Sequence, residues 1–122
     1  MTSQELQARF KAFSYNIVTI CESLAADRKV SKVIEYQLLK SAFSASANYR
    51  AACKAQSPAA FKSKLSISFE EIDESLFWLE SINDLSLAKN TELVTVIKEA
   101  DELTRILAAT RKKLEQKEVK QS

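Results

Sequence analysis

The sequence predicts an all-α protein, folded as an antiparallel up-down-up-down bundle of four helices. Its 122 residues contain no glycine and a single proline, whereas the hairpins and bulges of β-sheets rely on glycine. Apolar residues recur at steps of three and four in four successive segments, which is the spacing of amphipathic helices. The connections between these segments are about five or six residues long, so consecutive helices are expected to be antiparallel neighbours.

The first helix is expected from about residue 4 to about residue 25. Thr2 and Glu5 have the spacing of a capping box at its start. The apolar seam repeats every three or four residues and consists of Leu6, Phe10, Phe13, Ile17, Ile20 and Leu24. A seam of six large apolar side chains has to be covered by other helices.

The second helix is expected to follow Ser31 as its N-cap and to end near Lys54. Its inner side is Ile34, Leu38, Ala42, Ala45, Tyr49 and Ala52. Most side chains between Ser41 and Ala47 are small, which favours a tight crossing with a neighbouring helix. Asn48 lies within this face, and a buried amide without partners costs about 1–3 kcal/mol. We therefore expect Asn48 to form a structural hydrogen bond between helices.

The third helix is expected to open at Ser57 and Pro58, as N-cap and first helical residue, and to run to about residue 83. Its main apolar stripe is Phe61, Leu65, Phe69, Ile72, Leu76 and Leu79. Phe77 and Trp78 lie beside this stripe, so the helix presents apolar surface on more than one side. That surplus predicts a contact with another subunit.

The fourth helix is expected to be capped by Asn90 or Thr91. Its stripe is Leu93, Ile97, Ala100, Leu103, Thr104 and Leu107. Residues 111–122 are highly charged and are expected to form a frayed tail. A chain of this length supports one domain, which we expect to cover residues 1–122.

The residue types needed for common enzymatic chemistry are missing. The chain has no histidine, so the Glu-x-x-His pairs of di-metal bundles are absent, as are a Gly-rich phosphate loop and a base that activates serine. One acidic group hints at a metal: Glu70, Glu71, Asp73 and Glu74. Adjacent acids spread around a helix, which favours a solvated or base-paired face, with a carboxylate magnesium site as the alternative. We expect no enzymatic activity, no metal and no cofactor.

A cytoplasmic protein is expected. The first ten residues are polar, and no stretch approaches the roughly 20 apolar residues that a membrane span requires. Cys21 and Cys53 fall within apolar helical patterns and are expected to be buried, reduced thiols. A disulfide between them is the alternative, disfavoured by that compartment.

Positive charge is concentrated in one part of the chain. The net charge is only +2, but residues 28–64 carry eight bases against Glu35 alone, a local charge of +7. Five of these bases occupy the second helix, the following turn and the start of the third helix, where some can share one flank of the bundle: Lys40, Arg50, Lys54, Lys62 and Lys64. Repeated in an oligomer, they predict a multivalent phosphate-binding surface; the alternative is that they only confer solubility.

The central motifs are those of a known family. They are Gln37-Leu38-Leu39-Lys40-Ser41, Ser44-Ala45-Ser46-Ala47-Asn48-Tyr49-Arg50, and Phe61, Leu65, Ile67 and Glu71 followed by Glu74-Ser75-Leu76-Phe77-Trp78-Leu79-Glu80. This segment resembles the four-helix-bundle proteins encoded in intervening sequences of bacterial 23S rRNA genes, which are related in fold to the accessory protein of diversity-generating retroelements. The sequence departs from the family pattern at Ser46, usually glycine, and at Ala51, often glutamate.

The resemblance implies a ring-like homo-oligomer, typically a pentamer, without known enzymatic activity and with nucleic-acid binding suspected or shown for relatives. The retroelement relative works with a reverse transcriptase and binds RNA through a basic surface. A protein partner of that kind is implied here by analogy only.

Charge and resemblance together predict a cytoplasmic, non-enzymatic homo-oligomer that holds structured RNA or DNA by phosphate contacts. The bases expected to make these contacts are Lys40, Arg50, Lys54, Lys62 and Lys64, with shape rather than base identity deciding preference. Asn48, Phe77 and Trp78 are the candidate structural or interface residues. The alternative function is a protein-interaction module in which the bases have no binding role.

Overall fold

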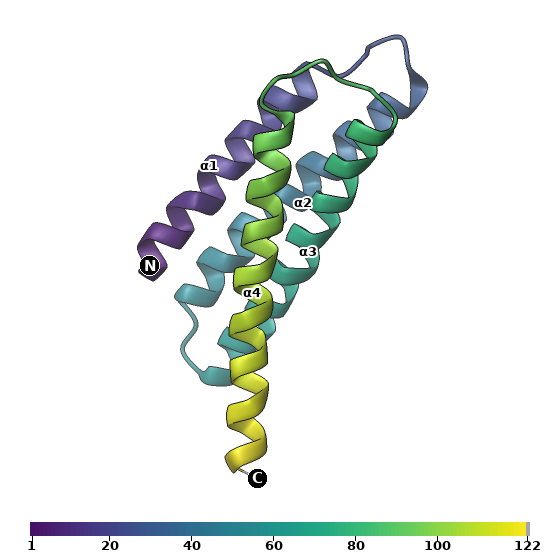
Figure 1. Ribbon diagram of the computed structural model, residues 1–122. Helices are drawn as coiled ribbons and strands as arrows, with labels where there is room; N and C mark the ends of the chain where they lie inside the picture. Colours follow the sequence, from purple (N-terminus) through teal and green to yellow (C-terminus); the bar gives the residue numbers. More distant parts are fainter. Residues whose placement is uncertain (122) are drawn as a thin grey trace.

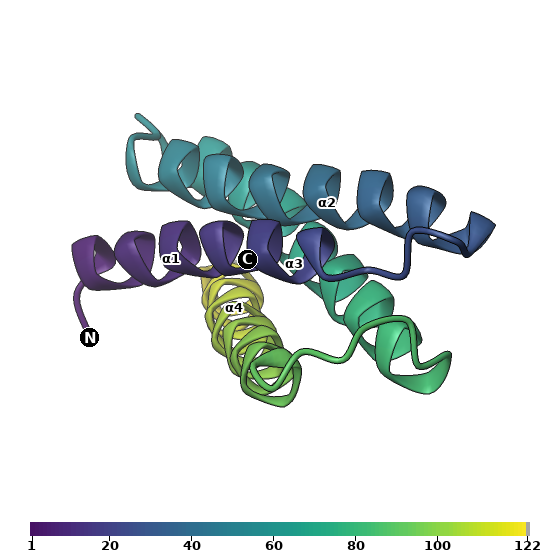
Figure 2. The same cartoon turned by 90° about the horizontal axis from the view of Figure 1, so that it is seen from above.

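The computed structural model describes residues 1–121; Ser122, the last residue of the expected tail, lies outside the described part. Four helices follow one another, with successive helices antiparallel (Figure 1). They are α1 (Ser3–Glu22), α2 (Lys29–Cys53), α3 (Pro58–Asp84) and α4 (Leu93–Gln121). The predicted all-α, up-down-up-down bundle is confirmed. Seen from above, α1 and α2 lie side by side and α4 crosses them at an angle (Figure 2).

Two of the predicted helix caps are present and one is wrong. Thr2 Oγ1 accepts a hydrogen bond from the Glu5 amide at 3.1 Å, and Ser57 Oγ accepts one from the Ala60 amide at 3.1 Å. Ser31 does not cap α2, because the helix begins two residues earlier at Lys29. Ser31 is instead buried in the first turns of α2, where its hydroxyl has no hydrogen-bond partner in the described part of the chain.

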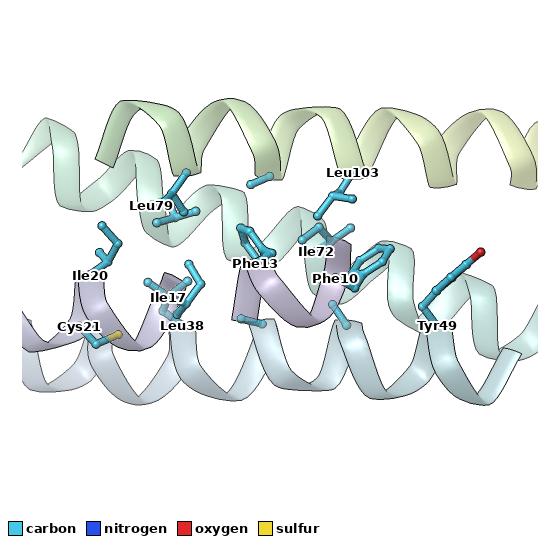
Figure 3. Close-up of a cluster of buried hydrophobic side chains, with 14 of the residues drawn as sticks. Phe10, Phe13, Ile17, Ile20, Cys21, Leu38, Tyr49, Ile72, Leu79 and Leu103 are labelled. Carbon is cyan, nitrogen blue, oxygen red and sulfur yellow. The ribbon is translucent and has the colours of Figure 1, made fainter. Parts of the chain in front are cut away.

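The predicted apolar seams of α1 and α2 form the centre of the core (Figure 3), except that Leu24 follows the end of α1 and is only partly buried. On α3 the buried face is rotated from the predicted stripe. Phe69 and Leu76 are only half-buried, whereas Ser68 and Ser75 are fully buried. These serines face α2: Ser68 Oγ donates to the Ala45 carbonyl at 2.7 Å, and Ser75 Oγ bonds the hydroxyl of a serine of α2 at 2.8 Å. An apolar repeat cannot reveal polar residues that pack in this way.

The connection between α3 and α4 folds back onto the core without glycine. Ser86 takes a positive φ of 53°, which is rare for a residue with a Cβ. It allows Leu87 to turn inward, where only 1% of its surface is exposed. The Ala25 amide donates to the Leu87 carbonyl at 2.8 Å. The two connections at this end of the bundle are thereby tied to each other.

The end of α4 differs from the expected frayed tail, because the helix continues from Arg111 to Gln121. Leu114 is half-buried against the core. The Arg111 guanidinium lies 4.8 Å from the centre of the Phe69 ring, within the range of a cation–π contact. The chain therefore retains tertiary contacts in a stretch whose composition alone indicates a loose end.

Candidate nucleic-acid interface

A groove of about 600 Å³ runs along the seam between α1 and α2. On each helix its lining residues are single residues or adjacent pairs that recur about every three or four positions, which places them along one edge of that helix. They are Gln7, Ala8, Lys11, Ser14 and Tyr15 from α1, and Phe43, Ser46, Ala47, Arg50 and Lys54 from α2 and its C-cap.

Small hydroxyl side chains form the floor of the groove. Ser14 Oγ and Ser46 Oγ are 2.5 Å apart, and Ser46 Oγ also lies 2.8 Å from the Phe10 carbonyl oxygen across the helix interface. Side chains this small let the two helices approach closely. Ser46 thus fits at this close approach by hydrogen-bonding to α1, in agreement with the predicted tight crossing.

The groove is positively charged. Lys11, Arg50 and Lys54 line it and no acidic residue does. None of the three forms an ion pair within residues 1–121. Two acids near this seam lie beyond the groove: Glu22 and Glu35, which add to the effect of burial in raising the pKa of the Cys21 thiol, lie about two turns further along α1 and α2 than Tyr15 and Phe43.

Two aromatic side chains face each other across the groove. The ring centres of Tyr15 on α1 and Phe43 on α2 are 6.4 Å apart, with planes inclined at 42°. Tyr15 is 55% exposed and Phe43 is 42% exposed. The rings therefore touch without covering each other, and part of each ring remains accessible to a ligand.

The five predicted bases do not form one site. Arg50 and Lys54 line the groove. Lys40 lies 6.0 Å from the ring centre of Tyr36 and close enough to Glu71 to oppose the rise in the pKa of that carboxyl, which burial and neighbouring Glu74 cause. It belongs to the α2–α3 side of the bundle.

The remaining two predicted bases lie in the first two turns of α3. Lys62 Nζ is 2.7 Å from Glu118 Oε2 of α4, so its charge is partly neutralised. Lys64 is exposed and forms no ion pair in the part of the chain that the structure describes. Both bases lie near the end of the bundle where α2 ends and α3 begins.

Lys11, Tyr15 and Phe43 were missed by the sequence analysis. Lys11 and Tyr15 are four residues apart, so their shared face on the first helix was visible. The apolar seam of that helix predicted only which of its faces enters the core. Which of the two edges of that face lies against α2 is decided by how the two helices pack.

Three residues were expected in structural or interface roles. The Asn48 amide donates to the Ser44 carbonyl at 2.9 Å, one turn earlier on α2, so its hydrogen bond lies within a helix and not between helices. Phe77 is 58% exposed and packs edge-on against Trp78, with ring centres 5.0 Å apart. Trp78 is half-buried, and its Nε1 has no hydrogen-bond partner in the described chain.

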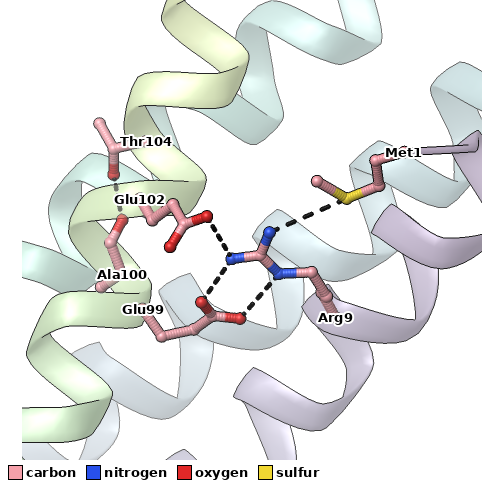
Figure 4. Close-up of polar contacts among 6 residues, drawn as sticks. All are labelled: Met1, Arg9, Glu99, Ala100, Glu102 and Thr104. Carbon is pink, nitrogen blue, oxygen red and sulfur yellow. Dashed lines mark hydrogen bonds and ion pairs between the residues drawn. The ribbon is translucent and has the colours of Figure 1, made fainter.

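A second cleft, of about 430 Å³, lies between α1 and α4 and has mixed charge, because Lys98, Glu92, Glu99 and Glu102 are among its lining residues. Arg9 of α1 forms a two-pronged contact with Glu99, at 2.6 and 3.1 Å, and a 3.2 Å ion pair with Glu102 (Figure 4). The hydrogen bond to Glu99 is the main cause that raises the pKa of Arg9. Arg9 is thus neutralised by two glutamates that line this cleft, so the cleft is less suited to a polyanion than the groove between α1 and α2.

The acidic residues of α3 and the cysteines show no reactive arrangement. Loss of hydration raises the pKa of Glu71, neighbouring Glu74 raises it further, and Lys40 opposes them. Within residues 1–121, no three cysteine, aspartate or glutamate side chains are placed to hold a metal ion. Cys21 is buried, Cys53 is partly buried, and both are free thiols. No helix in this range is long and apolar enough to cross a membrane.

The fold and the groove define a small antiparallel helical bundle with a basic groove between its first two helices. Residues 4–109 match the family model of the 23S rRNA-intervening sequence protein, and the chain belongs to this family. It is similar to a crystal structure of a protein of unknown function from the S23 ribosomal protein family of Bacteroides thetaiotaomicron VPI-5482. The two share 27% identity with a TM-score of 0.79 over 92% of this chain and 99% of the other. No curated protein matches the chain.

Proposed function

We propose that the protein is a non-enzymatic homo-oligomer that binds nucleic acid through the groove between α1 and α2. The observation that carries this proposal is the trio Lys11, Arg50 and Lys54. These side chains line a concave surface that has no acidic lining residue, and none of them forms an ion pair within residues 1–121. Lysine and arginine side chains that form no ion pair within the protein attract phosphate oxygens, and their binding releases the counterions of the nucleic acid. Lys64 extends the positive surface around the end of the bundle.

Assembly of several copies is supported by apolar side chains that the single chain leaves exposed. Phe77 on α3 is 58% exposed, and Val33 and Tyr36 on α2 are 57% and 63% exposed. Contact between copies would cover such residues. A ring, a pentamer by resemblance to the family, would repeat the groove on every subunit and convert weak phosphate contacts into tight binding.

Fluorescence anisotropy with a labelled mixed-sequence RNA, measured over a range of salt concentrations, tests the proposal. In the variant with Lys11→Gln, Arg50→Gln and Lys54→Gln, we expect weaker binding at low salt. We also expect a salt dependence reduced by about 1 in slope for each lost phosphate contact.

The matched control is the triple variant Arg28→Gln, Lys29→Gln and Lys32→Gln. It removes the same charge from the far end of α2, where these bases are exposed, and should bind nearly as the wild type does. Equal losses in both variants would show that only net charge matters. Absence of binding by the wild-type protein at low salt would refute the proposal.

A protein-interaction module is the second candidate function, and the exposed Phe77 ring against Trp78 favours it. In this case the oligomer would present an apolar or acidic surface to another protein. Retention of one defined protein partner in a pull-down after nuclease treatment, lost in Phe77→Ala, would support this function over nucleic-acid binding.

A further inference from the structure

We infer that the groove between α1 and α2 takes single-stranded RNA, with an unpaired base stacked on Tyr15 and Phe43 and the flanking phosphates on Lys11, Arg50 and Lys54. This inference rests on the proposed function and specifies the form of nucleic acid that the groove accepts. It differs from the expectation of structured RNA or DNA held by shape alone.

The aromatic pair is the first step of the argument. The rings of Tyr15 and Phe43 come from different helices, are inclined at 42°, and leave about half of each residue exposed. Stacking on aromatic side chains tolerates any base, because every base has a π-face. In a duplex those faces are covered by neighbouring base pairs, so only an unpaired base can use this platform.

The arrangement of charge along the groove is the second step. On α1, Lys11 lies four residues from Tyr15, about 6 Å along the helix; on α2, Arg50 lies seven residues from Phe43, about 10 Å. Because α1 and α2 are antiparallel, these bases lie on the same side of the aromatic pair. Glu22 and Glu35 lie on its other side, together with Arg28, Lys29 and Lys32 at the start of α2, so within the groove itself positive charge lies only on the Lys11 side. When a base stacks on the aromatic pair, the phosphates on one side of that base therefore lie against Lys11, Arg50 and Lys54.

The floor of the groove has little capacity to read base edges. The Ser14 and Ser46 hydroxyls are already hydrogen-bonded to each other and to backbone carbonyls. Gln7 lies at the basic end and makes no hydrogen bond within residues 1–121 through its side chain. Its amide is suited to a ribose 2′-hydroxyl, the group that distinguishes RNA from DNA. Loops and bulges of RNA also supply the unpaired bases that the platform needs.

A competing occupant is a second copy of the chain, whose acidic residues Glu70 and Glu74 on α3 are exposed. Two aromatic rings and three bases are a small apolar area for a stable protein contact, which normally has a core depleted of charge. Two aromatic rings beside three basic side chains that form no ion pair are better suited to a nucleotide strand. Solution mass distinguishes the two occupants.

The experiment measures anisotropy of three labelled probes of equal length, about 12 nucleotides: a single-stranded RNA without self-complementarity, the corresponding RNA duplex, and the single-stranded DNA. We expect the single-stranded RNA to bind tightest. Tyr15→Leu or Phe43→Leu should weaken its binding roughly tenfold, the effect of one lost stacking contact, while binding of the duplex stays unchanged. Leucine keeps an apolar side chain at these exposed positions, so the fold should be retained.

The matched control is Val94→Ala, which shortens an exposed apolar side chain near the start of α4 that lies outside the groove and should leave binding unchanged. Equal binding of duplex and single strand, or wild-type affinity in both groove variants, would overturn this inference. If one of these results occurred but the Lys11, Arg50 and Lys54 triple variant lost RNA binding, the inference would fail while the proposed function would stand. Equal affinity for the DNA strand would overturn the assignment to RNA. A change of molar mass in the groove variants would assign the rings to a contact between copies.

Discussion

Cys21 shows how burial changes the chemistry of one residue. The side chain is 6% exposed, and loss of hydration, together with the charges of Glu35 and Glu22, raises the pKa of its thiol from 9.0 to about 12. The folded protein therefore holds the thiol proton more tightly than the unfolded chain does. This stabilisation is complete below pH 9 and is lost as the pH rises from 9 toward 12.

We predict that the Cys21→Ala variant is less sensitive to alkaline pH than the wild type. Above pH 9, the wild-type free energy of unfolding should fall relative to that of the variant by up to about 1.4 kcal/mol per pH unit. Urea unfolding at pH 8, 9 and 10 measures the difference. A constant difference over this range would show that the thiol ionises equally easily in both states.

Ser46 is a residue whose size is dictated by the approach of α1. Its hydroxyl lies 2.8 Å from the Phe10 carbonyl oxygen and 2.5 Å from Ser14 Oγ. Replacing it with leucine overfills the contact, and we predict a loss of about 1–3 kcal/mol in the free energy of unfolding.

Chemical denaturation of Ser46→Leu and of Ala47→Leu tests this prediction. Ala47 is the next residue along α2 and is exposed, so leucine there should change stability by no more than about 0.5 kcal/mol. Equal changes in the two variants would mean that packing against α1 does not limit the size of residue 46.

Among the elements, α4 departs most from what its composition indicates. Its last three turns are rich in charge, yet Leu114 packs on the core, Arg111 lies over Phe69, and Glu118 pairs with Lys62. Each contact is modest by itself, since exposed ion pairs contribute about 0–1 kcal/mol. Together they hold the end of α4 against α3.

We predict that truncation after Thr110 lowers the free energy of unfolding by about 1–3 kcal/mol, through loss of the Leu114 and Arg111 contacts. Removal of residues 120–122 alone, which leaves those contacts in place, should change it by less than about 0.5 kcal/mol. Urea unfolding followed by circular dichroism measures both. Unchanged stability after the longer truncation would contradict a packed end of α4.

At the scale of the whole molecule, the bundle leaves apolar side chains exposed on more than one face. Phe77 is 58% exposed on α3, although its neighbour Trp78 is half-buried. Exposure of this kind on a helix that already contributes to the core is the physical basis for the proposed assembly.

We predict a molar mass in solution that is a multiple of the 13.7 kDa chain, reduced toward one chain in Phe77→Lys. The control is Val94→Lys, at a residue that is 55% exposed near the start of α4, which should leave the mass unchanged. Light scattering after size exclusion at micromolar concentration measures it. A stable single chain in the wild type would refute the assembly.

The candidate site was only partly visible in the sequence. Arg50 and Lys54 stood out as part of a basic stretch, but in the same stretch Lys62 pairs with Glu118 of α4, and Lys40 lies over Tyr36 on the side of α2 that faces Glu71 of α3. Lys11 completes the groove from a different helix. Charge counted along the chain cannot tell which bases share a surface.

The sequence by itself determined that the chain forms four helices, where Thr2 and Ser57 start two of them, and to which family it belongs. Apolar periodicity and cap chemistry are local, so they can be recognised without a neighbour. Only the tertiary structure decided that Ser68 and Ser75 enter the core, that α4 stays helical beyond Arg111, and that α1 and α2 enclose a basic groove. These features depend on the rotation and crossing of packed helices, which bring together residues on the flanks of the apolar stripes.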